Sequence, residues 1–523
     1  MKYKLLFILF FLAEISLFAQ ENLPLSHTYN AYRAEYLDRL NVNFHSSVKP
    51  YLSSEINALR TRSVFSGDTI DNWNYQFAAE LFHKDTSISD WSWNVSPVLR
   101  GIYSLDVVND TSYFGRGLGL SASISYREKL SFHAEVVTDN SPWPTYVDSM
   151  IHPYGIIPAY GIAHPTSQGY SFTMPGGYVS WSPHTIFNFQ AGYGKHFWGD
   201  GYRSLLLSDN SYNYPYFKAT ATFWRVKYSV LYTMMKDITG TNGDPSLFRN
   251  KYSTLHYLDW NISKRVSLGI FESVVWRAKD TLLNRGYDVN YLNPFVFFRP
   301  VEYSQGSSDN VLIGLNLKVN ITDHYLIYGQ MILDEFLLKE IKADSGWWAN
   351  KYGFQIGAKA FSPFGIEHLQ LQAEYNFVRP FTYSHRSSIE SYSHYGAPLA
   401  HPLGANFKEG VFIIRYFLKR FSFEEKCVVA HYGTDQLGLS YGGDPLKSYS
   451  LRVGDYHNFI GQGLSNDLIY NELKVSYVLD QKSDLRLFTA YTFRSLNQGS
   501  NKDQFSMISF GLSAWLFNQY TDR

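Results

Sequence analysis

The sequence predicts an all-β fold, a transmembrane antiparallel β-barrel of about 18 strands with a small N-terminal helical or periplasmic segment. Three observations predict it. Apolar and polar side chains alternate along most of the 523 residues, and the connections alternate between short and long. Beyond residue 20 there is no apolar run approaching the roughly 18 residues that a membrane helix needs. If the chain meets lipid, it therefore does so through strands.

The alternation is clearest at 369–377. Successive side chains of a strand point to opposite faces, so the segment presents one apolar and one polar face. The apolar face holds Leu369, Leu371, Ala373, Tyr375 and Phe377, and the polar face holds Gln370, Gln372, Glu374 and Asn376. The same division occurs at 187–193, 311–319 and 352–360. Soluble β-sandwiches alternate too, so this pattern predicts strands without naming their surroundings.

Connection lengths point to a membrane. Strands are predicted at 96–108, 115–126, 130–139, 177–182, 186–194, 217–224, 228–235, 252–260, 265–277, 309–319, 324–336, 350–361, 367–379, 409–417, 423–432, 466–479, 485–494 and 504–517. Brief polar turns such as 127–129 and 320–323 alternate with long linkers such as 140–176 and 380–408. Short turns on one side and long loops on the other are typical of bacterial outer-membrane barrels.

Backbone chemistry explains the closed form. Inside hydrocarbon every N–H and C=O must find a partner within the protein, so a sheet can cross only if it leaves no free edge. Aromatic residues make up 18% of the chain, and their amphipathic rings suit the lipid headgroup level. The alternative, a series of soluble sandwich cores, would need linkers or composition shifts between domains, and none is visible in the sequence.

Three regions follow from the sequence. Residues 1–20, with Lys2, Lys4 and an apolar stretch ending near Ala19, read as a signal peptide that directs export to the outer membrane. Residues 21–95 are predicted to form an N-terminal periplasmic or plug segment, with a helix over 27–40 after a possible N-cap at Ser26 and a possible strand pair within 72–84. Residues 96–523 are predicted to form the barrel. A buried N-terminal helix is the alternative for residues 1–20.

Composition and motifs exclude several functions. Lysine and arginine total 46, as do aspartate and glutamate, and no basic stripe favours nucleic acid. The single cysteine, Cys427, excludes an internal disulfide and is best explained as a small apolar strand residue. The chain lacks GxSxG, HExxH, P-loop and EF-hand motifs. Asp334 and Glu335 are adjacent in a predicted strand, so they are expected to point to opposite faces. We therefore expect no enzyme activity, no cofactor and no metal.

The long loops are rich in Tyr, Trp, Asn, Asp, Gly and His. Aromatic faces stack on the apolar side of a sugar ring and short polar groups hydrogen-bond its hydroxyls, so these loops suit a glycan. Ordinary exposed barrel loops have the same composition, and their histidines are most simply hydrogen-bonded surface residues.

The segment GKHFWGDGYRSLLLSDN at 194–210 resembles a motif of the Wzi family of outer-membrane capsule-assembly proteins. The likeness continues through Asn293, Pro294, Phe298, Arg299, Pro300, Glu302, Asp309 and Asn310, through Asp334, Glu335 and Phe336, through Glu374, Tyr375, Asn376, Arg379, Pro380, Tyr383, Ser384 and His385, and through HYGAPLAHPLGANFK at 394–408. Ala400 stands where the family often has Gly. The chain is also similar to the gliding-motility protein RemB.

The resemblance implies an 18-stranded barrel whose extracellular loops close the outer mouth, with helical material near the periplasmic end. It implies a lectin-like protein that binds capsular or other surface polysaccharide, with outer-membrane lipid and other outer-membrane proteins as further partners. A gliding-motility or adhesion component and a diffusion porin are the alternatives.

The candidate glycan-binding residues are Trp198, Asp200, Arg203, Arg299, Glu302, Tyr383, His385, His394 and His401. Each also has a structural interpretation. Gly199, Gly201 and Pro402 are expected to shape turns, and Arg299 with Glu302 could form a lumenal salt bridge that holds a plug.

Overall fold

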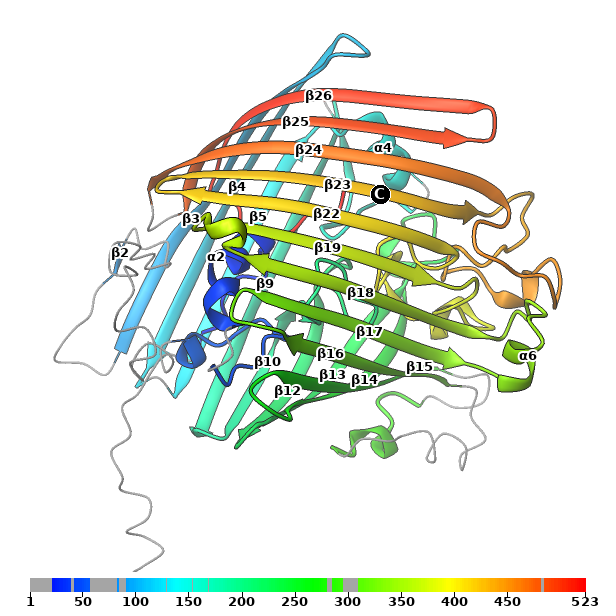
Figure 1. The fold of residues 1–523 in the computed structure, drawn as a ribbon, viewed down its shortest axis with the longest axis horizontal. Helices are drawn as coiled ribbons and strands as arrows, with labels where there is room; N and C mark the ends of the chain where they lie inside the picture. Colours follow the sequence, from blue (N-terminus) through cyan, green and yellow to red (C-terminus); the bar gives the residue numbers. More distant parts are fainter. Residues whose placement is uncertain are drawn as a thin grey trace, which may run out of the picture.

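The computed structural model describes residues 21–38, 42–56, 82–83, 91–127, 129–152, 154–167, 169–279, 285–294, 309–480 and 484–523. Within them the chain forms a closed antiparallel barrel of 18 long strands (Figure 1). The predicted signal peptide lies outside the described residues, as do the candidate residues Arg299 and Glu302 and most of the predicted strand pair at 72–84.

The wall strands follow one another around the barrel in chain order. They are β3 (Trp91–Asp106), β4 (Thr111–Tyr126), β5 (Leu130–Ser141), β9 (Gly169–His184), β10 (Phe187–Gly194), β12 (Tyr214–Phe223), β13 (Val226–Asp237), β14 (Arg249–Asn261), β15 (Val266–Arg277), β16 (Asn310–Asn320), β17 (Tyr325–Glu335), β18 (Lys351–Phe361), β19 (Leu369–Val378), β22 (Phe407–Leu418), β23 (Phe421–Thr434), β24 (Leu464–Asp480), β25 (Leu485–Gln498) and β26 (Asn501–Ser513). The barrel closes where β26 pairs with β3, from Met507 opposite Asp106 to Ser513 opposite Arg100.

Each predicted strand has an observed counterpart, and the differences lie at strand ends. β3 begins at Trp91, ahead of the predicted barrel boundary at 96. β9 begins at Gly169 because its first half, which contains Pro175 and reads as loop in the sequence, pairs with β5. β26 ends at Ser513, ahead of the predicted 517, because the chain turns into the lumen there, where Asn518 donates to the Leu25 carbonyl and to Asp209.

The barrel is apolar outside and polar inside. In β19 Tyr375 points outward and is 40% exposed, whereas its neighbour Glu374 points into the lumen and is 4% exposed. Ile356 and Gln355 of β18 show the same contrast, at 59% and 3%. An apolar outer face with a polar interior is the arrangement that lipid demands, which confirms the alternation predicted from the sequence.

Short turns join the strands at one barrel end, on the left in Figure 1, and long loops gather at the other end, on the right. Exposed aromatic side chains ring the short-turn end: Trp91, Trp181, Phe187, Phe223, Trp224, Trp260, Tyr325, Phe364 and Phe421. Such a girdle marks a membrane interface. Barrels of this class have short periplasmic turns and long extracellular loops, so we assign the short turns to the periplasm and the long loops to the cell surface. Among the described residues no helix is long and apolar enough to cross a membrane.

The remaining short elements either lie outside the sheet that forms the barrel wall or pair with one of its strands. The helices are α4 (Thr145–Ile151) and α6 (Leu338–Lys342), with 3-10 turns η2 (Pro245–Leu247), η3 (Val289–Leu292), η4 (Pro363–Gly365), η5 (Ser388–Glu390) and η6 (Tyr449–Leu451). The short strands are β2 (Phe82–His83), β6 (Ile156–Ile157), β7 (Gly161–Ile162), β8 (His164–Thr166), β20 (Ser393–His394) and β21 (Ala397–Pro398). Of these, β2 pairs with β3 and β8 with β9.

The lumen is occupied by both ends of the described chain. The helix α2 (His27–Leu37) begins at Ser26, whose side chain accepts from the Tyr29 N–H, and lies inside the barrel near the short-turn end (Figure 1). This confirms the predicted helix, although it ends at Leu37. β1 (Val48–Lys49) then pairs with β11 (Phe197–Trp198) within the lumen. The tail 514–523 returns inward from β26, so the barrel encloses a plug.

Candidate functional site

The loop between β10 and β12, residues 195–213, folds into the lumen. Trp198 is fully buried and stacks on Tyr257 of the wall, with ring centroids 5.2 Å apart. Gly199 has φ 149°, and a Cβ there would collide with the side chain of Gln330. The glycine therefore lets the loop approach the wall closely, as its predicted role in shaping a turn implies.

The loop between β19 and β22, residues 379–406, meets this first loop across the lumen. The hydroxyl of Tyr383 donates to the carbonyl of Leu205 at 2.8 Å, and that of Tyr392 donates to Leu206 at 2.7 Å. The Ser208 N–H donates to the Leu399 carbonyl at 2.7 Å. Two of the sequence segments that carry Wzi-like motifs thus form one crossing layer inside the barrel.

Four buried charged or titratable residues hold this layer, and we call them the lumenal network: Arg203, His401, Glu409 and Asp522. Arg203 donates to Glu409 at 2.8 Å and to Asp522 at 3.0 Å, and His401 lies 2.7 Å from the same Glu409. Burial lowers the pKa of His401 more than Glu409 raises it. Burial opposes the charge on Asp522, yet Arg203 and Lys426 hold its pKa well below the usual value.

A second set of charges ties the N-terminal segment to the wall. Asp200 accepts from Ser46 at 2.6 Å and from Asn316 at 2.9 Å. Lys318 of β16 donates to Ser46 at 2.6 Å and to Asp38 at 2.9 Å. Burial alone would raise the pKa of Asp200, but Lys318 and Lys49 lower it below the ordinary value. The carboxylate is therefore charged and held in a preformed site.

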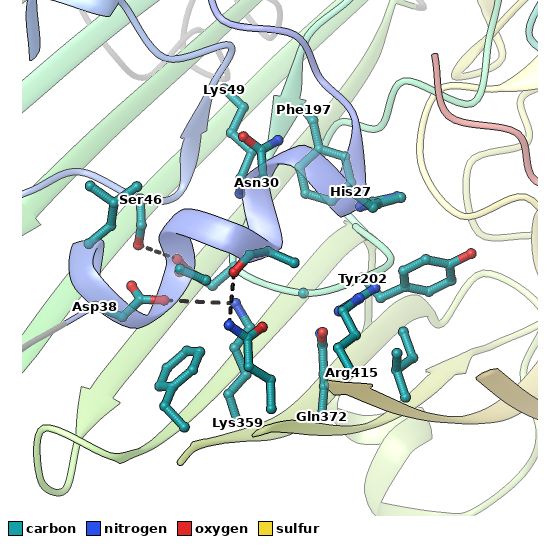
Figure 2. Close-up of a pocket in the computed structure, with 18 of the residues that line it drawn as sticks. His27, Asn30, Asp38, Ser46, Lys49, Phe197, Tyr202, Lys359, Gln372 and Arg415 are labelled. Carbon is teal, nitrogen blue, oxygen red and sulfur yellow. Dashed lines mark hydrogen bonds and ion pairs between the residues drawn. The ribbon is translucent and has the colours of Figure 1, made fainter. Parts of the chain in front are cut away.

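A cavity of about 70 Å³ lies beside this set, between α2 and the wall. Figure 2 shows Lys359, Gln372 and Arg415 extending from the wall strands toward the α2 side, where His27 and Asn30 lie. Lys49 also lines the cavity, and burial lowers its pKa to about 8. Phe197, Asp200 and Tyr202 of the inward-folded loop 195–213 also line the cavity.

The three loop histidines do not converge. His385 contacts Glu390 at 3.1 Å, His394 accepts from the Lys236 N–H at 2.9 Å and contacts the Asn213 carbonyl at 3.1 Å, and His401 contacts Glu409. Each thus has partners of its own. In the described ranges no three His, Cys, Asp or Glu side chains gather as metal ligands.

All seven described candidate residues are buried, and His385, at 6%, is the most exposed of them. The structure brings Trp198, Asp200, Arg203, Tyr383 and His401 into the crossing layer and its supports, while His385 and His394 lie in the same loop with partners of their own. A glycan outside the barrel cannot touch these side chains unless the loops move. The surface-loop interpretation of the histidines does not fit their burial.

Partly buried aromatic side chains gather at the outer end instead, in a group that the sequence reasoning missed. We call Trp347, Trp348, Tyr449 and Arg452 the mouth cluster. The Trp348 ring lies 4.7 Å from that of Tyr449 and 6.3 Å from that of Trp347, and Arg452 lies 4.2 Å over Trp348. The tandem tryptophans in the connection between β17 and β18 were the available sequence signal.

Backbone hydrogen bonds hold the mouth cluster in place. The Trp348 N–H donates to the Asp455 carbonyl at 2.9 Å, and the Asn458 N–H donates to the Gly346 carbonyl at 2.8 Å. These bonds join two connections far apart in the chain, 336–350 and 435–463. Tyr456 and Phe459 of the second connection are also exposed, at 52% and 47%, which extends the aromatic surface.

Asp334 and Glu335 lie next to the mouth cluster. The expectation that their side chains point to opposite faces of the strand is wrong. The register between β17 and β18 shifts between Leu333 and Glu335. This irregularity lets both carboxylates reach the ammonium group of Lys351, at 3.3 and 3.2 Å. Strict alternation, on which the sequence argument relied, fails at a bulge. The pair nevertheless neutralises a lysine and shows no catalytic arrangement.

The closed wall, the apolar outer face and the aromatic girdle define an outer-membrane β-barrel with a filled lumen. No family model and no curated protein matches the sequence. The chain is similar in structure to Wzi of Escherichia coli, described as a carbohydrate-binding β-barrel involved in group 1 capsule assembly. The TM-score is 0.59 at 15% identity, over 95% of this chain and 100% of that one. The fold expected from the sequence resemblance is thereby confirmed.

Porins give weaker matches. OccAB2 of Acinetobacter baumannii has a TM-score of 0.44 at 10% identity, covering 80% of this chain and 97% of its own. OprD of Pseudomonas aeruginosa has a TM-score of 0.42 at 12% identity, covering 83% and 99%. At these identities the likeness concerns the fold alone.

Proposed function

We propose that this barrel is a lectin-like protein that binds surface polysaccharide and takes part in assembling or attaching capsule or exopolysaccharide. The mouth cluster is the observation that carries the proposal. Trp347, Trp348 and Tyr449 offer aromatic faces at the cell-surface end, where a long polymer can reach them without entering the lumen. Aromatic residues and arginine are the groups that dominate binding surfaces.

Polar groups beside the rings suit sugar hydroxyls and carboxylates. Arg452 donates to Asp455 at 2.7 Å while stacking on Trp348, and Glu335 is half-exposed beside Lys351. A sugar ring stacked on Trp347 would find donors and acceptors at its edge. The described carbohydrate binding of Wzi, which has the same fold, supports this choice.

The glycan-binding residues predicted from the sequence remain part of the proposal. Direct glycan contact by Trp198, Asp200, Arg203, Tyr383, His385, His394 and His401 stays a prediction that requires the loops to open. In the closed arrangement these residues would position the loops that carry the surface residues. Substitution of a buried member and of a mouth-cluster member should therefore have different effects.

The test is a polysaccharide pull-down with the purified barrel in detergent. Trp347→Ala should lower retention at least tenfold with the melting temperature unchanged, because Trp347 is only partly buried. Trp181→Ala is the matched control, since Trp181 is 51% exposed on the lipid-facing wall at the opposite end. Equal retention by wild type and Trp347→Ala would reject the mouth cluster as the binding site.

Deletion of the gene distinguishes the cellular roles. Under our proposal, polysaccharide is released into the medium. Unchanged polysaccharide retention together with lost surface spreading would instead favour the gliding-motility or adhesion role.

A further inference from the structure

Two cavities lie between the plug and one side of the barrel wall. The larger, of about 280 Å³, reaches Tyr113, Ser141 and Trp143 toward the loop end. The smaller, of about 70 Å³, reaches Ser422 and Asp484 at the short-turn end. Both are lined by β22 to β26 on the wall side, and the larger extends onto β3 and β4. A single water needs roughly 10–15 Å³ of such space, so both have room for several waters.

The two cavities adjoin each other. They share Ser26, Thr28, Arg415, Glu424, Lys474, Phe488, Ser513 and Trp515. Together their linings run along the wall from the short-turn end to the base of the long loops. We call this space the side passage. It bypasses the crossing layer of loops 195–213 and 379–406, which blocks the barrel axis.

Charged side chains line the side passage, and most are paired. Arg415 lies 2.6 Å from Glu424, and Arg486 lies 2.6 Å from Asp484. Lys426 lies 3.3 Å from Asp522 and 3.8 Å from Glu472. Arg100 lies 3.0 Å from Asp139, which stands behind the lining. These pairs cancel much of the field along the wall.

Lys474 differs from its neighbours. It lies where the two cavities join, with its ammonium group 4.8 Å from the centroid of the Phe488 ring. Within the described part of the chain it has no carboxylate partner at ion-pair distance. A cation without a carboxylate partner beside an aqueous path attracts anions and repels cations.

We propose that the barrel conducts small inorganic anions through the side passage while its axis stays blocked. This activity is independent of glycan binding at the mouth cluster. It differs from an open diffusion porin because the path runs beside a blocked axis and its selectivity depends on one lysine.

The test uses the full mature chain in planar lipid bilayers with chloride as the probe. A KCl gradient should give a small conductance whose reversal potential indicates anion preference. Lys474→Glu should shift the preference toward cations, whereas Lys474→Arg should keep it. Lys129→Glu, in the exposed turn between β4 and β5, should leave it unchanged. Wild type without conductance above the lipid alone, or a Lys474→Glu variant with unaltered selectivity, would overturn the proposal.

Chemical modification of a cysteine introduced into the side passage tests whether ions follow this route. Ser513 lines both cavities, so a Ser513→Cys, Cys427→Ala protein should lose most of its conductance on reaction with a bulky methanethiosulfonate, and a reductant should restore it. The parent protein is the control, because Cys427 lies in β23 and does not line the passage. Mass spectrometry that shows complete modification of Ser513→Cys with undiminished conductance would place the current elsewhere and overturn the proposal.

Discussion

Arg203 donates to the carboxylate of Asp522 at 3.0 Å, and both side chains are completely buried. One residue belongs to the loop between β10 and β12, and the other is next to last in the chain. Their pairing fixes the C-terminal tail against the loop that crosses the lumen. It therefore joins the end of the chain to the layer that blocks the barrel axis.

Removing the charge of Arg203 should destabilise the folded protein. Arg203→Met leaves Glu409 and Asp522 buried without their cation, and breaking a buried pair in this way costs about 3–5 kcal/mol. Thermal unfolding in detergent micelles should occur at a lower temperature, with faster proteolysis of loop 195–213. Arg452→Met is the control, since its partner Asp455 is exposed and such a pair contributes about 1 kcal/mol or less. If both variants unfold at the same temperature, the lumenal network does not stabilise the layer.

Lys318 should hold the N-terminal plug. Lys318→Met removes the donor to Asp38 and Ser46, so the amides of α2 should exchange with deuterium at least tenfold faster while those of β16 stay protected. Lys359→Met provides a comparison, because Lys359 lies 3.9 Å from Asp38 and is the more exposed of the two lysines. Exchange in α2 that is equal in wild type and Lys318→Met would contradict this role.

His394 should make the loop layer sensitive to acid. Burial lowers the pKa of His394 to about 3, and its Nδ1 accepts from a backbone N–H, so protonation breaks a hydrogen bond. Because the folded pKa lies below the unfolded value of about 6.5, stability is complete above that value and falls as the pH decreases toward 3. Between pH 7.5 and 4.5 the free energy of unfolding should fall less in His394→Gln than in wild type, by on the order of 2 kcal/mol, and melting temperatures across this pH range measure the difference. Parallel curves would refute the assignment.

A charged side chain on the lipid-facing surface should destabilise the folded barrel. Ile356→Lys places an ammonium group on the outer face of β18, at a cost of about 2–4 kcal/mol near the middle of the bilayer. Folding into lipid vesicles, followed by the shift in gel mobility of the folded barrel, measures the loss. Ile356→Leu should fold like wild type. A lysine variant that folds equally well would show that this face does not meet lipid.

Local pattern made the wall predictable. Whether a residue such as Glu374 faces inward is decided by its position within a strand, and a period of two is visible in any short segment. The helix at Ser26 was predictable for the same reason, since an N-cap acts within one turn. The predictions failed where local rules are broken, as at the bulge beside Glu335 and at Ser513, where the chain leaves the wall.

The candidate site was less predictable because its contacts are not local. The sequence motifs named Arg203 and His401 but could not show that both bind Glu409 in the closed lumen. The mouth cluster depends on two connections that meet after the barrel has closed, so Trp348 and Arg452 carry no shared signal in the chain.

The sequence by itself determined that this chain crosses a membrane as strands. Its segments alternate between apolar and polar residues, and every backbone N–H and C=O must be paired inside lipid, so such segments can cross only as a closed barrel. Tertiary structure alone decided that the lumen is filled and which side chains reach the cell surface. The reason is that closure of the wall brings together residues hundreds of positions apart, such as Arg203 and Asp522, and no spacing along the chain encodes that meeting.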